Sequence, residues 1–311
     1  MKFIKAKTIL GVVVLIVTNF SYADPLPKGG TSEWVDVESG RLKARAYSSA
    51  VLSENPVLIV VLHGDVPNPN MDYHYIFAQL FAEGPTSPGP LLDQLRAALG
   101  SVFPDYLISS RVPDDIVVVG LLRPGYSDYE GDTSSGELGM ALADNYTPEV
   151  IDAVTEAINK LKTEYSARTV ILVGHSGGAT IVANVLGLHP EVADGALLVA
   201  CNCDPVAWRT KARAGEFAQF NWEHPYKSLS PLDLASGVST SIKISLLSGA
   251  EDNSVSSTYT LAYAEALEKH GVHTIVKIAS NLGHDDIVFT PLMFDQLKQI
   301  IELVRIQKES L

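Results

Sequence analysis

Continuous apolar runs rich in Val, Ile and Leu are the strongest pattern in the chain. Five runs stand out and a weaker sixth follows: Val57–Leu62, Ile116–Leu122, Val170–Val173, Ala196–Ala200, Ile242–Leu247 and Val272–Ala279. Such runs lack polar alternation, which is typical of strands buried on both faces of a parallel sheet. Before them, Trp34–Val37 and Arg41–Tyr47 alternate apolar and polar positions around Glu38-Ser39-Gly40, which predicts a half-exposed antiparallel hairpin.

Helical patterns lie between the apolar runs. Thr147 is followed by Pro148 and by apolar residues on one face up to about Tyr165, a pattern typical of a capped helix with proline at its first position. Three further helices are predicted at Ser176–Leu188, Ser256–His270 and Pro291–Ile306. Strands that alternate with helices predict right-handed crossovers, and so an α/β fold with a doubly wound, mostly parallel sheet.

The N-terminal segment has the features of an export signal. Lysines precede the apolar run Thr8–Val17, and a short polar stretch ends at Ala23. This pattern predicts a secretory signal peptide over residues 1–23 with cleavage after Ala23. The run has roughly half of the ~20 residues needed to span a bilayer, so no stable membrane insertion is expected after cleavage. Residues 24–311 are then a single exported domain, periplasmic or secreted.

Two connections exceed what packing requires, namely Asp65–Asp115 and Cys203–Ser241. Long connections in a compact domain are usually functional or disordered. The second is rich in aromatic residues and follows a strand end, which predicts a short lid-like insertion near residues 204–241. Trp208 and Trp222 in this insertion are candidates for lining a substrate pocket.

Composition narrows the class of protein. The 311 residues are 46% hydrophobic and 19% charged, which is globular composition, and the formal net charge is −13. An acidic surface repels phosphate backbones, so nucleic acid is not an expected partner. Cys201 and Cys203 are the only cysteines. On an extended segment their Cα atoms would lie near the ~7 Å limit for a disulfide, so a bridge and two free thiols are both open interpretations.

Gly174-His175-Ser176-Gly177-Gly178 fits the pattern G-x-S-x-G directly between a predicted buried strand and a predicted helix. In that context the pattern indicates a nucleophile elbow, which projects the serine hydroxyl from the carboxyl edge of the sheet. We therefore expect Ser176 to be a nucleophile.

An activated serine needs a histidine base that is held by a carboxylate. Among eight histidines, His284 follows the last predicted strand, which is the position from which this topology presents a base. Asp252 follows the preceding strand and is the expected orienting acid, with Glu251 as the neighbouring alternative. Less favoured carboxylates are Asp285, Asp286 and Asp204.

A developing oxyanion needs backbone N–H donors. Gly177 directly follows the serine, and the turn after the first buried strand offers Asp65, or else Gly64. Neighbouring side chains are candidates for lining a substrate pocket: His63, Tyr126 and His175.

On these residues the chain resembles the α/β-hydrolase superfamily. The segments Gly249…Asp252…Val255 and Gly283-His284-Asp285 are similar to the catalytic domain of prolyl-oligopeptidase-like serine hydrolases (S9-type) and to related esterases. Peptidases of that group usually carry an N-terminal β-propeller, whereas about 30 residues precede the first predicted strand here. No residues for gripping a peptide terminus carry over.

The sequence-based hypothesis is an exported serine hydrolase that cleaves carboxylic esters. A serine peptidase or amidase is the second interpretation, and a non-catalytic binding module on the same fold is the third. The expected partner is a small ester or a short peptide. The chemistry requires no metal and no organic cofactor.

Overall fold

Eight strands form one sheet in the computed structural model, which describes residues 30–65, 73–84, 114–138, 145–215, 222 and 227–310. The strand order is β1-β2-β4-β3-β5-β6-β7-β8. The hairpin β1–β2 is antiparallel and joins β4 antiparallel, whereas the pairs from β4 to β8 are parallel. The strand bounds are Thr31–Val37, Gly40–Ser48, Val57–Leu62, Ile116–Leu121, Thr169–His175, Gly195–Val199, Lys243–Gly249 and Thr274–Ala279, for β1 to β8 in order.

The sheet separates two hydrophobic cores, because successive side chains of a strand point to opposite faces. Leu58, Val60 and Leu62 of β3 enter one core, and the intervening Val57, Ile59 and Val61 enter the other. Every residue of β3 is buried, as are all residues of β4 and β5. The apolar runs in the sequence are continuous for this reason.

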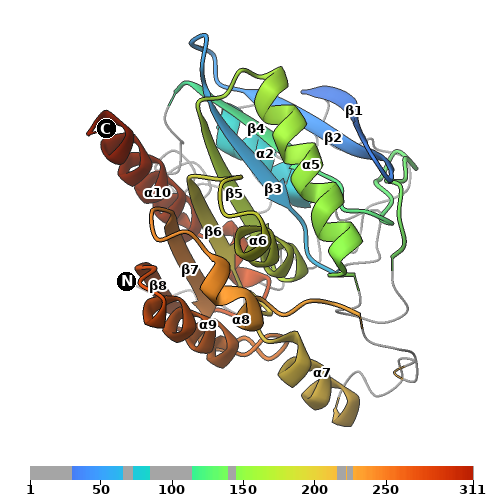
Figure 1. The fold of residues 1–311 in the computed structure, drawn as a ribbon, viewed down its shortest axis with the longest axis vertical. Helices are drawn as coiled ribbons and strands as arrows, with labels where there is room; N and C mark the ends of the chain where they lie inside the picture. Colours follow the sequence, from blue (N-terminus) through green and yellow to red (C-terminus); the bar gives the residue numbers. More distant parts are fainter. Residues whose placement is uncertain are drawn as a thin grey trace, which may run out of the picture.

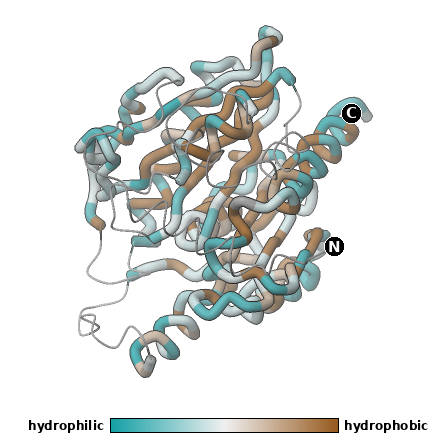
Figure 2. The backbone as a smooth tube through the Cα atoms, turned by 180° about the vertical axis from the view of Figure 1, so that it is seen from behind, coloured by the Kyte–Doolittle hydropathy of each residue, from teal (hydrophilic) through white to brown (hydrophobic). Residues whose placement is uncertain are grey.

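Helices cover both faces of the sheet (Figure 1). The first core takes side chains from α5 (Pro148–Glu164), α6 (Gly177–Leu188) and α9 (Ser257–Lys269). The second core takes them from α2 (Tyr73–Glu83) and α10 (Pro291–Glu309). Figure 2 shows the resulting arrangement, with hydrophobic strands inside and hydrophilic segments toward the outside. The predicted α/β class, with its mostly parallel sheet and antiparallel hairpin, is confirmed.

Shorter elements follow the carboxyl ends of the later strands. They are α7 (Pro205–Ala214), α8 (Pro231–Leu234), η1 (Ala235–Gly237) and η2 (Asp286–Phe289). The first three belong to the insertion predicted near residues 204–241, of which 216–221 and 223–226 lie outside the described residues. The predicted signal peptide, residues 1–23, also lies outside them. Within the part of the chain that the structure describes, no helix has both the length and the apolar character to cross a bilayer.

The parallel strands determine where polar side chains can meet. β3, β5, β6, β7 and β8 all run in the same direction, so the loops that follow them emerge at one edge of the sheet. These five loops hold most of the residues singled out from the sequence, and Tyr126 follows β4, which is parallel to β3.

Candidate active site

The turn from β5 to α6 holds Ser176 in a strained conformation. Its φ is 53° and its ψ is −121°, in a region that a residue with a side chain rarely occupies. The glycines around it make room for this turn. A Cβ at Gly178 would lie 2.3 Å from the Leu62 carbonyl oxygen, and one at Gly174 would lie 2.5 Å from the Ala179 nitrogen. The pattern G-x-S-x-G is therefore a steric requirement of an elbow packed between β3 and α6.

The structure brings Ser176, His284 and Asp252 together. The His284 Nε2 lies 3.0 Å from the Ser176 Oγ, and the His284 Nδ1 lies 2.8 Å from the Asp252 Oδ2. The other carboxylate oxygen of Asp252 accepts hydrogen bonds from the backbone N–H groups of Ser254 and Val255, at 2.9 and 2.7 Å. The carboxylate is thus fixed in place, and the imidazole lies between it and the hydroxyl.

The surroundings of His284 favour its protonated form. Burial alone would lower its pKa, but the hydrogen bond to Asp252 and the charges of Asp252, Asp285 and Asp65 outweigh burial and raise the pKa above 6.5. A base with a raised pKa binds a proton more readily. This arrangement suits the transient acceptance of a proton from Ser176.

His175 shows the opposite behaviour although its ring lies close to that of His284, with 4.9 Å between the centroids. Burial, aided by the charge of His284, lowers the pKa of His175 to about 4. Its Nε2–H donates a hydrogen bond to the backbone oxygen of His284 at 3.2 Å. His175 is therefore neutral at physiological pH, and it holds the loop that carries His284.

The alternative carboxylates lie elsewhere. Glu251 is exposed. Asp204 accepts from the Ala207 N–H at the start of α7, at 3.0 Å, and Asp286 accepts from the Gly283 N–H at 3.1 Å. The charge of Asp285 acts on both His175 and His284. Of the carboxylates considered, Asp252 makes the hydrogen bond to the His284 ring.

The turn after β3 lies directly against the elbow. A Cβ at Gly64 would be 3.0 Å from the Ser176 Cβ, and a Cβ at Gly177 would be 2.2 Å from the Asp65 Oδ1. Gly64, Asp65 and Gly177, which were predicted to supply oxyanion donors, are therefore neighbours of the nucleophile. The small size of both glycines allows this approach.

A cluster that sequence reasoning missed holds the Asp65 carboxylate. Its Oδ1 accepts from the Arg123 Nη1 at 2.8 Å and from the Tyr126 hydroxyl at 3.3 Å, and its Oδ2 accepts from the Tyr146 hydroxyl. Arg123 is fully buried, and its guanidinium packs over the rings of both tyrosines. Nothing in the sequence around Tyr146 signals this role, because the tyrosine precedes an ordinary helix start.

His63 serves the same turn and has no hydrogen-bonding capacity left for a substrate. Its Nδ1–H donates to the Gly64 oxygen at 2.8 Å, and its Nε2 accepts from the Arg123 backbone N–H at 3.1 Å. Burial lowers its pKa to about 3, so the ring is neutral. Like the Tyr126 hydroxyl, His63 braces the turn. That these two side chains also line a substrate pocket stays a prediction.

Trp208 and Trp222 are buried in the first core, with exposed fractions of 6% and 8%. Their rings meet edge to face, with centroids 6.4 Å apart. The Trp208 indole N–H donates to the Ser254 oxygen at 2.7 Å and so ties α7 to the loop that carries Asp252. Their predicted role as a pocket wall stays a prediction.

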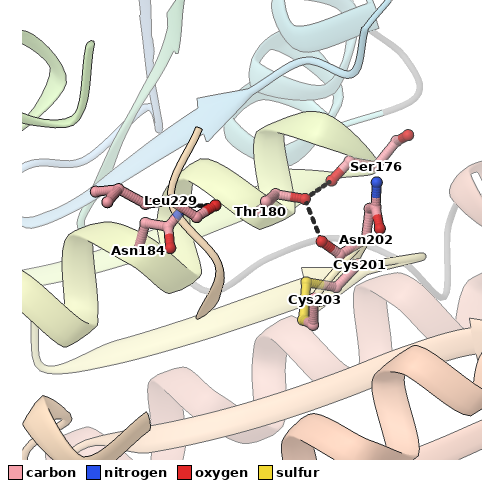
Figure 3. The surroundings of a disulfide bond; sticks show 7 residues. All are labelled: Ser176, Thr180, Asn184, Cys201, Asn202, Cys203 and Leu229. Atoms are coloured by element: carbon pink, nitrogen blue, oxygen red, sulfur yellow. Dashed lines mark hydrogen bonds between the residues drawn. A yellow bond between two sulfur atoms is a disulfide. The ribbon is translucent and has the colours of Figure 1, made fainter. Parts of the chain in front are cut away.

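Cys201 and Cys203 form a disulfide (Figure 3). Their Cα atoms are 5.1 Å apart, closer than an extended segment allows. The segment from Cys201 to Cys203 is therefore not fully extended. The sequence left the bridge and the free thiols equally open because it does not show the backbone conformation between the two cysteines.

Two groups of side chains among the described residues have the spacing of metal ligands. One is His175, His284 and Asp285, whose histidines make the hydrogen bonds already described. The other is Asp128, Glu130 and Asp132. There, Lys43 pairs with Asp132, Arg45 pairs with Glu130 at 2.7 Å, and backbone N–H groups satisfy Asp128. Both groups are explained by contacts within the protein.

The comparison with protein families agrees with this geometry. The model of the prolyl oligopeptidase family matches residues 127–298, which include the elbow, Asp252 and His284. The chain belongs to the prolyl oligopeptidase family. It is thus a serine hydrolase of the α/β-hydrolase fold, as its resemblance implied. No curated protein sequence matches the chain significantly.

Solved structures share the fold at low sequence identity. Est1E from Butyrivibrio proteoclasticus is 12% identical with a TM-score of 0.58, and the match covers 89% of this chain and 100% of Est1E. The acylaminoacyl peptidase of Pyrococcus horikoshii is 13% identical with a TM-score of 0.57, covering 94% of this chain but 43% of the peptidase. A puromycin hydrolase is 17% identical with a TM-score of 0.59, and the match covers 91% of this chain and 40% of the puromycin hydrolase.

Proposed function

We propose that this serine hydrolase cleaves carboxylic esters through an acyl-enzyme intermediate, with Ser176 as nucleophile, His284 as general base and Asp252 as orienting acid. The observation that carries the proposal is the pair of contacts from His284, 3.0 Å to the Ser176 Oγ and 2.8 Å to Asp252. A serine hydroxyl is inert at neutral pH until a base accepts its proton. His284 is held where it can do so.

The reaction follows from these positions. The Ser176 Oγ attacks the ester carbon while its proton passes to the His284 Nε2, and Asp252 stabilises the imidazolium through the Nδ1–H. The tetrahedral intermediate collapses, and His284 returns the proton to the departing alcohol oxygen. Water then attacks the acyl-enzyme with His284 as base, which releases the carboxylic acid and restores the serine hydroxyl.

The oxyanion of each tetrahedral intermediate needs donors that are already in place. We assign this role to the backbone N–H groups of Gly177 and Asp65, with Gly64 as the alternative in the same turn. The buried cluster of Arg123, Tyr126 and Tyr146 supports the assignment, because it fixes the side chain of Asp65 and with it the turn. Donors on a rigid turn need no reorganisation when charge develops.

Esters are favoured over peptides as substrates by the share of each solved structure that the match covers. The match covers the whole of Est1E, which has also been solved with ferulic acid bound, but less than half of the acylaminoacyl peptidase and of the puromycin hydrolase. The family description and those two hydrolases support a serine peptidase or amidase as the second candidate.

A fluorophosphonate probe tests the nucleophile directly. Ser176→Ala should abolish labelling and ester turnover, whereas Ser32→Ala, which alters an exposed serine of β1, should change neither. Labelling that persists in Ser176→Ala would refute the assignment. Folded wild-type protein that shows neither labelling nor turnover would point to a binding module instead.

Substrate class needs a separate assay. Turnover of p-nitrophenyl esters and of aminoacyl or peptide p-nitroanilides should be measured side by side on purified protein. We expect kcat/KM to be at least about 100-fold higher for the esters, because an alkoxide or phenoxide leaves more easily than an amide nitrogen and no peptide-gripping residues carry over. Comparable values would favour the peptidase.

We also propose that the protein is exported after cleavage behind Ala23. The basic head, the short apolar run and the small residue at the cut support this, and a buried disulfide suits an oxidising compartment. N-terminal sequencing of the protein from the periplasm or medium should begin at Asp24. Full-length protein found in the cytoplasm would contradict export.

A further inference from the structure

The disulfide holds one side chain beside the nucleophile. Asn202 lies between the two bridged cysteines, on the loop that follows β6 (Figure 3). Both cysteines are fully buried, and Asn202 is 97% buried, with an exposed fraction of 3%. A ring closed across three residues leaves the middle residue little freedom to move its backbone.

Hydrogen bonds join this loop, and the end of β6 that precedes it, to the elbow. The Thr180 hydroxyl of α6 donates to the Asn202 backbone oxygen at 3.0 Å and lies 3.3 Å from the Ser176 backbone oxygen. The Ser176 N–H donates to the Val199 oxygen at the end of β6, at 2.9 Å. The position of Asn202 relative to the nucleophile is therefore fixed from two sides.

The side chain of Asn202 has no partner. Its Oδ1 is buried without a hydrogen bond, whereas its Nδ2, which is not a fully buried unpaired atom, makes no hydrogen bond with any residue that the structure describes. Figure 3 shows the amide nitrogen turned toward Ser176. Burying an unpaired amide costs free energy, so buried polar groups in folded proteins are almost always paired.

Two other buried asparagines also have an unpaired Oδ1, but their Nδ2 atoms make hydrogen bonds. The Nδ2 of Asn184 donates to the Leu229 oxygen at 3.4 Å, and the Nδ2 of Asn145 donates to the Pro124 oxygen at 3.3 Å. Each of these side chains ties one segment of the main chain to another. The Asn202 side chain makes no such tie among the residues that the structure describes, and its amide nitrogen is turned toward Ser176 (Figure 3).

We propose that Asn202 is a specificity-determining residue that donates an Nδ2–H hydrogen bond to an acceptor oxygen on the acyl group of the substrate, close to the scissile carbonyl. The proposal rests on the proposed function. The acyl group is the expected ligand because the leaving group must lie beside the His284 Nε2 to receive its proton. His284 reaches the serine from the loop after β8, whereas Asn202 reaches it from the loop after β6.

The substrate class follows from this donor. It comprises esters whose acyl chain carries an ether, hydroxyl or carbonyl oxygen within a few bonds of the ester carbon. Esters of plain alkanoic acids leave the Asn202 amide unpaired in the complex, which disfavours them relative to an oxygen-bearing isostere.

Isosteric ester pairs test the proposal. The p-nitrophenyl esters of methoxyacetic and butanoic acid differ by one oxygen in place of a methylene, and so do those of 3-methoxypropanoic and pentanoic acid. For at least one pair, Asn202→Ala should lower the ratio of kcat/KM for the oxygen-bearing ester to that for the alkyl ester by about three- to tenfold, the value of one hydrogen bond. Activity on the alkyl ester should change less than about threefold.

Asn184→Ala is the matched control, since it removes a buried amide from α6 whose donor serves the main chain. It should leave both ratios unchanged. Asn202→Leu, which keeps the volume without a donor, should reproduce the effect of Asn202→Ala. Ratios that stay constant in both Asn202 variants, an equal loss on both members of each pair, or failure of both variants to fold would overturn the proposal.

Labelling separates this test from that of the proposed function. If wild-type protein neither binds fluorophosphonate nor turns over any ester, the proposed function fails. If labelling and turnover are intact in every variant but the ratios do not move, only the role of Asn202 fails.

Discussion

Two pairs of a histidine and an aspartate lie close to the elbow serine, and the two pairs differ in their contacts. In the loops after β7 and β8, His284 and Asp252 contact each other, and the pKa of the histidine rises. In the turn after β3, His63 is bonded to main-chain groups and Asp65 is paired with Arg123. Burial then lowers the pKa of His63 to about 3.

The comparison shows that residue type and closeness to the nucleophile do not settle a role. A histidine joined to a carboxylate can accept a proton, whereas one joined to carbonyl and N–H groups stays neutral and acts as a brace. In the second pair, Asp65 forms an ion pair with Arg123 and not a hydrogen bond with His63.

The largest effect is expected from the first pair. His284→Ala and Asp252→Asn should each lower kcat by about 10³- to 10⁴-fold, as when a base is removed or its tautomer is misdirected in serine triads. The free energy of unfolding should change little for His284→Ala. Steady-state kinetics and urea unfolding measure both, with the exposed His273→Ala as control. A loss below about tenfold in kcat would remove His284 from the proposed role.

Removal of Arg123, the cation that pairs with Asp65, should act mainly on stability. Arg123→Met leaves the mostly buried Asp65 carboxylate without its ion pair, which is expected to lower the free energy of unfolding by about 3 kcal/mol. Urea unfolding tests this against Arg168→Met, which alters an exposed arginine. A variant as stable as wild type would show that the cluster does not brace the turn.

A single hydrogen bond in the same cluster should matter less. Tyr146→Phe removes the hydroxyl that donates to the Asp65 Oδ2, so we expect about 1.5 kcal/mol of lost stability, the lower end for a bond to a charged group. Thermal and urea unfolding measure the loss. Tyr259→Phe is the control, since that tyrosine only packs against the first core. An equal effect of both changes would rule out a specific bracing bond.

The smallest expected effect is a displacement of the pH profile. His284 must be neutral to accept a proton, and its pKa is raised, so kcat/KM should fall as pH drops through a midpoint above 6.5. In Asp252→Asn the hydrogen bond to a charged partner is lost, and the midpoint of the residual activity should move to lower pH. A wild-type midpoint below 6, or no movement in the variant, would contradict this electrostatic account.

The fold could be read from the sequence because its strands are buried on both faces. Val57–Leu62 was predicted at the bounds that β3 has, and the helices starting at Pro148 and Pro291 begin where proline can occupy a first turn. Ser176, Asp252 and His284 could be placed because each lies in the turn or loop that follows a parallel strand, and parallel strands end at one edge.

The residues that brace the site could not be predicted from their position after a strand. Tyr146 reaches Asp65 across 81 residues, and Asn202 is held by a disulfide that the sequence left open. The bracing role of His63 and Tyr126 could not be predicted either, because a sequence does not show which groups form hydrogen bonds with a side chain. Their hydrogen bonds depend on packing between elements far apart in the chain.

The elbow and the disulfide-closed segment Cys201–Cys203 differ in how they would tolerate engineered substitutions. Added atoms at Gly174 or Gly178 would collide with main chain, so laboratory evolution at those positions should yield only inactive clones. Position 202 is held by its backbone, through the bridge and Thr180, while its side chain contributes no internal bond. A library confined to that one codon could therefore alter substrate preference without disturbing the catalytic geometry.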